Sequence, residues 1–359
     1  MTDTTGAAGS SDNRMGEARA RSLRARIGSS PAPGPIETRR GIEWHALGGE
    51  RDARLLAPLF ARIEAADNPP YRTSADEVRE MLSPARTWRG TGAWMTRGIA
   101  AGEMVAFGIV GLRRSGVLEC LCHGGVDPRF RKLGLGRALI DWQVATARSM
   151  LAEIDTTEPA QIVMHVDSGQ EDLEDQLVLA GFHWARTYYE LRADLRSAPE
   201  APRLGPLVSV VPWTPDLEGP TRRASNRLSE LEWGRPPQTE EQWLMGRTGF
   251  VPEWSFVALD KTSDRAKVIG FLMASRYDQD WAALGWKEGY VDLLGVLPQH
   301  RHAGVAEALI VASMKAQAAD GMDRIATGVG SANHSGALAL YETLGFQTVG
   351  ATKLYALNV

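Results

Sequence analysis

Short apolar runs alternate with amphipathic segments along the chain, and the same order of elements occurs twice. Strand-like runs cover residues 103–112 and 118–122 in the first half and 256–259, 268–274 and 290–296 in the second. Each half opens with a helical pattern interrupted by a double proline and closes with a strand, a helix and a Gly-Phe pair. This order predicts a mixed α/β fold, duplicated with about 165 residues per copy.

Polar and proline-rich stretches divide the chain. Residues 1–40 are rich in Ser, Gly, Ala, Pro and Arg and have few large apolar side chains, so they cannot bury enough surface to offset the entropy of ordering. Within them, residues 15–27 could form a transient basic helix. A second Pro-rich stretch lies midway between the two halves. We therefore predict a disordered tail, a first domain, a linker and a second domain over residues 1–40, 41–196, 197–206 and 207–359.

Composition limits the class of protein. The chain has 359 residues, of which 43% are hydrophobic and 23% charged, as expected for two soluble globular domains. Its two cysteines, Cys120 and Cys122, lie in an apolar run, which predicts buried structural thiols in a reducing compartment rather than a disulfide framework or a metal site. We find no membrane-spanning run and no signal-peptide core, so we expect a cytoplasmic protein without a membrane partner.

The charges are distributed unevenly. The net charge of −4 divides into +3 over residues 1–40, −4 over 41–206 and −3 over 207–359. Mildly acidic halves suit a small-molecule amine substrate better than a polyanion, so the sequence argues against a nucleic-acid partner. The basic excess is confined to the tail, where a solvated segment is the simpler interpretation and a nucleic-acid or membrane arm the alternative.

A glycine-bearing turn joins a strand-like run to an amphipathic helix in each half. It reads Arg-Lys-Leu-Gly-Leu-Gly over residues 131–136 and Arg-His-Ala-Gly-Val-Ala over residues 301–306. Small residues let successive backbone N–H groups approach an anion, and the N-terminus of the next helix adds its positive end. Neither turn has the spacing of a P-loop or of a dinucleotide fingerprint. The pair of turns therefore predicts pyrophosphate binding of another kind.

These turns and the closing pattern resemble the acetyl-CoA-binding motif of the GNAT superfamily of N-acetyltransferases. The resemblance covers roughly residues 41–195 and 207–359. It implies two tandem GNAT-like domains, each a mixed, largely antiparallel sheet flanked by helices, with acetyl-CoA as cofactor and its pantetheine arm lying where two strands splay apart. The implied cofactor-binding residues are Gly125, Val126, Arg131, Lys132, Leu133, Gly134, Leu135 and Gly136 in the first half, and Leu294, Gly295, Val296, Arg301, His302, Ala303, Gly304, Val305, Ala306 and Asn333 in the second.

The closing helix distinguishes the two halves. Residues 333–346 resemble the family's closing motif, in which an asparagine contacts the cofactor and a tyrosine, here Tyr341, protonates the departing thiolate. The alternative is that Tyr341 only packs the helix. The first half has Leu177 and Gly169 at the corresponding positions. We therefore expect little or no turnover there, unless Tyr188 or Tyr189 substitutes as the donor.

The general base is less well defined by the sequence. An amine must lose a proton before it attacks a thioester, and a lysine amine with a pKa near 10.4 needs more help than an α-amino group with a pKa near 8. Glu288, Tyr290 and Asp292 share one face of a predicted strand. In several relatives a glutamate on this strand acts through water, but Tyr290 holds that position here. The base therefore stays open between Asp292, Glu288 and a bound water, with purely structural roles as the alternative.

Aromatic and histidine residues suggest further roles. Trp233, Trp243 and Trp254 lie in the helical region that shapes the acceptor pocket in this family, so we expect them to influence specificity. His300 and His302 flank the second turn. On a turn beside a phosphate site, a solvated or ligand-contacting histidine is a better interpretation than a metal ligand, and we expect no metal.

The resemblance implies an N-acetyltransferase that moves an acetyl group from acetyl-CoA to an amine by direct attack, as a monomer or homodimer with catalysis in the second half. The architecture is similar to that of mycothiol synthases, but no substrate signature accompanies it. A mycothiol precursor amine, an aminoglycoside or other antibiotic amine, a polyamine and a protein N-terminus all remain candidate acceptors. The alternative class is a CoA-binding sensor or interaction protein without turnover.

Overall fold

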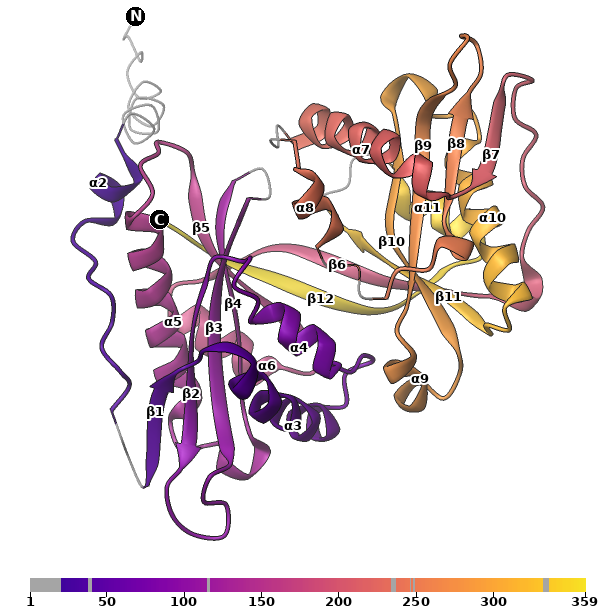
Figure 1. Ribbon diagram of the computed structural model, residues 1–359. Helices are drawn as coiled ribbons and strands as arrows, with labels where there is room; N and C mark the ends of the chain where they lie inside the picture. Colours follow the sequence, from indigo (N-terminus) through magenta and orange to yellow (C-terminus); the bar gives the residue numbers. More distant parts are fainter. Residues whose placement is uncertain are drawn as a thin grey trace, which may run out of the picture.

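The computed structural model describes residues 21–37, 41–114, 117–233, 237–245, 247, 249–331 and 336–359, apart from the side chains at positions 232 and 233. The strands in these ranges form one twelve-stranded sheet in the order β1-β2-β3-β4-β5-β12-β6-β11-β10-β9-β8-β7. Figure 1 shows two lobes joined by the long strands β6 and β12, which cross the middle of the molecule.

The first half contains the strands and helices that the duplication predicts. Its strands are β1 (Ile42–Ala46), β2 (Trp88–Met95), β3 (Met104–Arg114), β4 (Leu118–Val126), β5 (Ala160–Asp167) and β6 (His183–Asp194). Its helices are α3 (Gly49–Asp67), α4 (Ala75–Met81), α5 (Leu135–Ala152) and α6 (Glu171–Leu179). The predicted strands at 103–112 and 118–122 are confirmed as β3 and β4, whereas β1 and β2 were not recognised in the sequence.

The second half repeats this order with one addition. Its strands are β7 (Val208–Pro212), β8 (Phe256–Asp260), β9 (Lys267–Arg276), β10 (Glu288–Val296), β11 (Arg324–Gly330) and β12 (Gln347–Asn358). Its helices are α7 (Glu218–Trp233), α8 (Glu240–Leu244), α9 (Asp278–Leu284), α10 (Val305–Ala319) and α11 (Ala337–Thr343). The predicted strands β8, β9 and β10 are confirmed, and helix α9 is an insertion between β9 and β10 that the pattern did not predict.

Local chemistry explains where the helices after the double prolines begin. Ser74 and Glu77 form a capping box at the start of α4, and Thr239 and Gln242 form the equivalent box at the start of α8. Both boxes satisfy backbone N–H groups that the first turn of a helix leaves without partners. Helix α3 ends at Asp67 and is capped by Asn68, whose left-handed φ of 47° turns the chain toward Pro69 and Pro70.

The last strands of the two halves are exchanged. Strand β6 of the first half pairs with β11 of the second, from Asp194 opposite Arg324 to Tyr188 opposite Gly330. Strand β12 of the second half pairs with β5 of the first, so the C-terminus lies in the first lobe (Figure 1). The mixed, largely antiparallel fold is as expected, since among the described strands only the pairs β4–β5 and β10–β11 are parallel. The two halves, however, share one sheet instead of closing two separate sheets.

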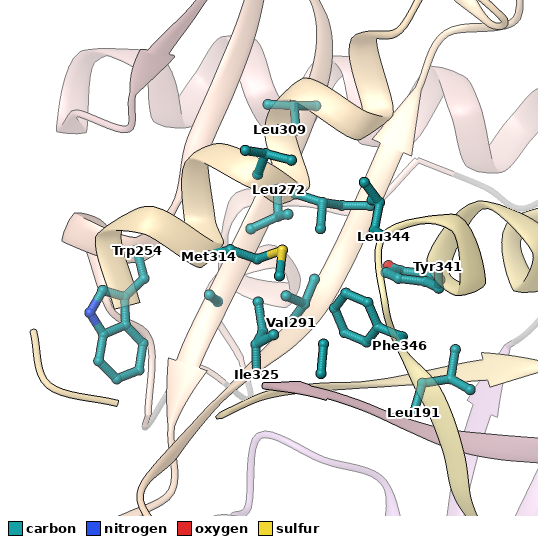
Figure 2. Close-up of a cluster of buried hydrophobic side chains, with 14 of the residues drawn as sticks. Leu191, Trp254, Leu272, Val291, Leu309, Met314, Ile325, Tyr341, Leu344 and Phe346 are labelled. Atoms are coloured by element: carbon teal, nitrogen blue, oxygen red, sulfur yellow. The ribbon is translucent and has the colours of Figure 1, made fainter. Parts of the chain in front are cut away.

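The hydrophobic cores show the same exchange. Leu191, Ala193 and Leu195 of the first half lie in the core of the second, against α10, β10 and β11. Tyr355 of β12 lies in the core of the first half. Figure 2 shows Leu191 approaching the cluster that contains Val291, Ile325 and Phe346. Because burial of apolar surface is the main stabilising term in folding, each half depends on the other for a complete core.

The N-terminal segment corrects one prediction. Residues Leu23–Ile27 form a short helix, α2, and Leu23 is completely buried among residues of the first half's core. Arg26 adds a hydrogen bond from its guanidinium to the carbonyl of Val359, 3.3 Å away. The prediction of a disordered tail over residues 1–40 was therefore wrong for residues 21–28. The buried side chain of Leu23 and the hydrogen bond from Arg26 to Val359 hold this segment against the first half. Residues 1–20 and 38–40 lie outside the described part.

Two smaller expectations can also be compared with the structure. Cys120 and Cys122 are free and buried, as predicted, and burial raises the pKa of Cys120 to about 12. The reactive thiolate is therefore strongly disfavoured at Cys120. Among the described helices, none has both the length and the apolar character needed to cross a membrane.

Candidate active site

The loop between β10 and α10 has an unusual backbone. It follows Val296 through a single 3-10 turn (Pro298–His300), and then His302 and Gly304 adopt left-handed φ values of 59° and 76°. Helix α10 begins at Val305, and within the part of the chain that the structure describes no side chain caps its N-terminus. Its first backbone N–H groups therefore point out of the helix without the side-chain acceptor that α4 and α8 possess, an arrangement that binds anions.

In the first half, the loop between β4 and α5 has similar backbone torsions. Lys132 and Gly134 have φ values of 60° and 83°, and α5 likewise begins at Leu135 without a side-chain cap. The surroundings of the two loops differ. Arg131 is held by Asp67 through two hydrogen bonds of 2.6 and 2.7 Å. In the second loop, a Cβ atom on Gly304 would lie 3.2 Å from Pro202 of the linker.

Strands β10 and β11 pair only over part of their length. They are parallel from Glu288 opposite Arg324 to Val291 opposite Thr327, and then they separate. A β-bulge between Val291 and Leu293 interrupts the pairing of β10 with β9 at the same point. We call this place the second fork. Beyond it, the β11-facing edge of β10, which includes Leu294, Gly295 and Val296, has no strand partner among the described residues, so its backbone can pair with an extended ligand.

Tyr341 lies at the second fork. Its hydroxyl interacts with the side chain of Thr327, whose own hydroxyl donates to the carbonyl of Val291 at 3.0 Å. The side chain is 3% exposed and packs edge-on against Phe346 (Figure 2). Burial raises the pKa of Tyr341 to about 12, so the phenol keeps its proton at neutral pH. Asn333 lies outside the described residues.

The opposite face of the second fork carries polar groups. The carboxylate of Asp292 accepts hydrogen bonds from the hydroxyls of Ser275 and Tyr277, the latter at 3.0 Å. Asp292 can be reached by solvent, but the protein packed around its carboxylate raises its pKa above the ordinary value. Ser275 and Tyr277 were not recognised in the sequence, because nothing in their local pattern separates them from ordinary residues near a strand end. We call this side of the sheet the acceptor face.

Glu288 and Tyr290 do not have equivalent environments. Glu288 is 8% exposed and is held by Arg192 through two hydrogen bonds of 2.8 and 3.1 Å, with a third bond from Trp286. Tyr290 instead donates to Glu190 at 3.3 Å, and burial raises its pKa well above the ordinary value. Because Arg192 and Trp286 already occupy both oxygens of this carboxylate, the geometry disfavours Glu288 as the base.

The first half also contributes to the acceptor face. The backbone N–H of Arg72 donates to Asp280 of α9 at 2.5 Å, and Gln279 donates to Glu77 of α4 at 3.2 Å. Burial raises the pKa of Asp280 to about 7, with smaller contributions from neighbouring carboxylates. A face with several carboxylates and raised pKa values favours a cationic ligand over an anionic one.

The tryptophans lie mainly in the core. Trp254 is 1% exposed, packs against α10 and donates its indole N–H to Asp320 at 3.2 Å, so it does not line the acceptor face. Trp243 is 5% exposed and lies between α7 and β9, with its indole N–H bonded to Glu218. Neither position supports the direct substrate contact that the sequence predicted. The side chain of Trp233 lies outside the described residues.

The first half has a corresponding fork with different side chains. Strand β4 separates from β5 after Cys122 opposite Met164, and its pairing with β3 has no bulge. Leu177 of α6 is completely buried where the second half has Tyr341. At the open end of this first fork, the ring of His123 packs 5.3 Å from Phe60 and 5.5 Å from Phe107. The first fork therefore keeps the strand separation but has the hydrocarbon side chain of Leu177 where the second has the phenol of Tyr341.

Comparison with known proteins agrees with this geometry. Residues 253–348 match the sequence model of the acetyltransferase (GNAT) domain family. The match covers β10, the loop and the closing helix, and it identifies residues 253–348 as similar to a GNAT acetyltransferase domain. No curated protein sequence matches the chain significantly.

Solved structures extend the fold to the whole chain. A GCN5-related N-acetyltransferase from Sphaerobacter thermophilus is similar, with a TM-score of 0.64, 23% identity, and coverage of 88% of this chain and 95% of that one. A tandem GNAT protein from the clavulanic acid biosynthesis pathway has a TM-score of 0.65 and 15% identity, covering 88% and 98% of the two chains. A putative acetyltransferase from Pyrococcus horikoshii has a TM-score of 0.54 and 13% identity over 90% and 91%. Residues 253–348 therefore match a GNAT acetyltransferase domain, and the whole chain has the fold of tandem GNAT proteins.

Proposed function

We propose that this protein is an acetyl-CoA-dependent N-acetyltransferase that acylates an amine in its second half. The observation that carries the proposal is the position of Tyr341, whose hydroxyl reaches Val291 through Thr327 where β10 and β11 separate. The uncapped N-terminus of α10 follows the same strand. A proton donor at a strand fork, close to an anion-binding loop, fits a substrate that carries both a thioester and a pyrophosphate.

The second loop fits the phosphates of the donor. Backbone N–H groups of His302, Ala303, Gly304, Val305 and Ala306 would hold the pyrophosphate, and Arg301 would add positive charge. The free edge of β10, with Leu294, Gly295 and Val296, would pair with the pantetheine arm. The first loop has the same torsions, so we propose that it binds CoA as well, through Arg131 to Gly136 together with Gly125 and Val126, but without turnover.

The residues around the second fork would supply two functions. Acetyl-CoA supplies the acyl group as an activated thioester. Tyr341 would donate its proton to the sulfur as the C–S bond breaks, because its high pKa keeps the phenol protonated beforehand. Asp292 and the other carboxylates of the acceptor face would attract and orient a cationic amine, which increases the rate by positioning.

The proposal is tested by calorimetric titration with acetyl-CoA and a thiol-release assay. The acceptor panel should contain a cysteinyl amine conjugate of the mycothiol-precursor type, an aminoglycoside, a polyamine and a peptide with a free N-terminus. Turnover that is lost in Tyr341→Phe while acetyl-CoA binding persists would support the assignment. Binding without turnover on any amine would favour a CoA-binding sensor, and absence of binding would exclude the proposed site.

A further inference from the structure

Glu190 occupies an unexpected place at the second fork. It belongs to β6 of the first half, but the strand exchange sets it opposite Gly328 of β11. Tyr290 of β10 reaches across Gly328, where a Cβ atom would lie 2.9 Å from the phenol oxygen, and donates to Glu190 at 3.3 Å. A glycine at position 328 therefore lets a carboxylate from one half approach the acceptor face of the other.

We propose that Glu190, supplied by the first half, accepts the proton of the acceptor amine in the site of the second half. This inference rests on the proposed function, because it assigns a role within that reaction. The first half would then contribute a catalytic residue through the exchanged strand, although its own fork lacks a proton donor. Glu190 lies one residue from Leu191, which is paired with Thr327, the hydrogen-bond partner of Tyr341.

Competing carboxylates are bound more firmly. Glu288 forms two hydrogen bonds with Arg192 and a third with Trp286. Each of the two carboxylate oxygens of Asp292 accepts a hydrogen bond from a hydroxyl group. Glu190 has one 3.3 Å bond from Tyr290 and one 3.3 Å contact with Arg192, both at the long end of hydrogen-bond geometry. Its side chain is 25% exposed, so an incoming amine can reach it.

The electrostatic surroundings of Glu190 also suit a base. The charged and titratable groups that face it are Arg192 on its own strand, Glu288 and Tyr290 on β10, and Asp280 on α9. Burial is the largest cause of its raised pKa and is reinforced by Glu288 and Asp280, whereas Arg192 and Tyr290 oppose it. The resulting pKa of about 7 leaves a substantial fraction of the carboxylate ionised at neutral pH, where a general base is most effective.

The step conserves atoms and charge. The ammonium form of the acceptor gives one proton to the Glu190 carboxylate and becomes a neutral amine. The freed lone pair forms the C–N bond to the acyl carbon, the C–S bond breaks, and the sulfur takes a proton from Tyr341. The nitrogen then loses its second proton to the Tyr341 phenolate, and Glu190 returns its proton to solvent. The products are the amide, free thiol and one released proton.

The first test is Glu190→Gln, with Asp194→Asn as the matched control. Asp194 lies on the same strand and pairs with Arg196 at the surface. In the Gln variant we expect acetyl-CoA binding within about twofold of wild type, kcat roughly 100-fold lower, and loss of the acidic limb of the pH–rate profile near pH 7. The control should keep both kcat and the limb. An unchanged kcat and limb in Glu190→Gln would overturn the proposal.

A second variant separates catalysis from folding. Tyr290→Phe removes the hydroxyl that lowers the pKa of Glu190, so the acidic limb should move to higher pH. A purely structural Glu190 predicts no such movement. Glu190→Asp should recover part of kcat if a carboxylate is needed. If the wild-type protein binds no acetyl-CoA, the proposed function fails. If the wild type is active but the acidic limb of the pH–rate profile stays at the same pH in Tyr290→Phe, only the role of Glu190 is contradicted.

Discussion

The fork between β4 and β5 and the fork between β10 and β11 have similar backbones and different side chains. Both are followed by a loop with left-handed torsions, near 60° at Lys132 and His302, and by a helix without a side-chain cap. Only the second fork has a β-bulge, and only it has a tyrosine on the closing helix, where the first has Leu177. An anion-binding loop made of main-chain groups tolerates many substitutions, whereas a proton donor is lost with one side chain.

A second difference between the halves concerns what each supplies to the other. Strand β6 brings Leu191 into the core of the second half and Glu190 and Arg192 to its acceptor face. Strand β12 brings Tyr355 to the core of the first half and no group to the first fork that the proposed reaction uses. In the proposed reaction, the first half would therefore lack its own chemistry and still be required for that of the second.

The largest effect should come from a substitution in one loop but not the other. Gly304→Glu adds a negative charge and a side chain at a left-handed residue beside Pro202. We expect acetyl-CoA affinity at the second site to fall by more than about 100-fold, because strain and like-charge repulsion add. Gly134→Glu has nearly the same torsion and serves as the control, with turnover within about twofold of wild type. If thiol release showed an equal loss of turnover in both variants, the two loops would not differ in function.

The next effect concerns the closing helices. Tyr341→Phe should lower kcat by roughly 100-fold while acetyl-CoA binding stays the same, because the proton donor acts only as the C–S bond breaks. Loss of the bond to Thr327 should also cost about 1 kcal/mol of unfolding free energy. Steady-state kinetics and urea unfolding measure the two quantities. A kcat close to wild type would mean that the donor lies elsewhere.

A third effect, on stability rather than turnover, tests how strongly the halves depend on each other. Arg192→Met leaves Glu288 buried without its ion-pair partner and should destabilise the protein by about 3 kcal/mol. The double variant Arg192→Met/Glu288→Gln should recover part of that loss, since no buried charge remains uncompensated. Arg196→Met, at an exposed pair with Asp194, should leave the urea midpoint unchanged. If the single and double variants were equally unstable, side-chain packing rather than the ion pair would explain the loss.

The smallest effect is a pH dependence of stability. The folded pKa of Glu190, about 7, lies above the ordinary value of 4.5, so its stabilising contribution is complete below pH 4.5 and is lost as the pH rises through 7. Wild type should therefore lose stability relative to Glu190→Gln between pH 5 and pH 8, by roughly 2.5 kcal/mol. Urea unfolding of both proteins at the two pH values measures this difference. A difference of opposite sign would contradict the raised pKa.

The sequence predicted the elements that depend on local pattern. Strands β3, β4, β8, β9 and β10 follow from apolar runs, and the two glycine-bearing loops follow from small residues between a strand and a helix. The duplication was visible because both halves repeat that order. Strands β1 and β2 escaped notice because β1 is short and β2 contains glycines and threonine where a strand pattern would have apolar residues.

What the sequence by itself determined is the GNAT-like repeat, the loops and the loss of the tyrosine in the first copy, since each depends on residues close together in the chain. Only the tertiary structure decided that β6 and β12 exchange places, because the choice of partner strand depends on which sheet edge is available and not on local propensity. That exchange joins Arg192 to Glu288, which are 96 residues apart, and Tyr290 to Glu190. Hence no spacing within either half could have pointed to Glu190.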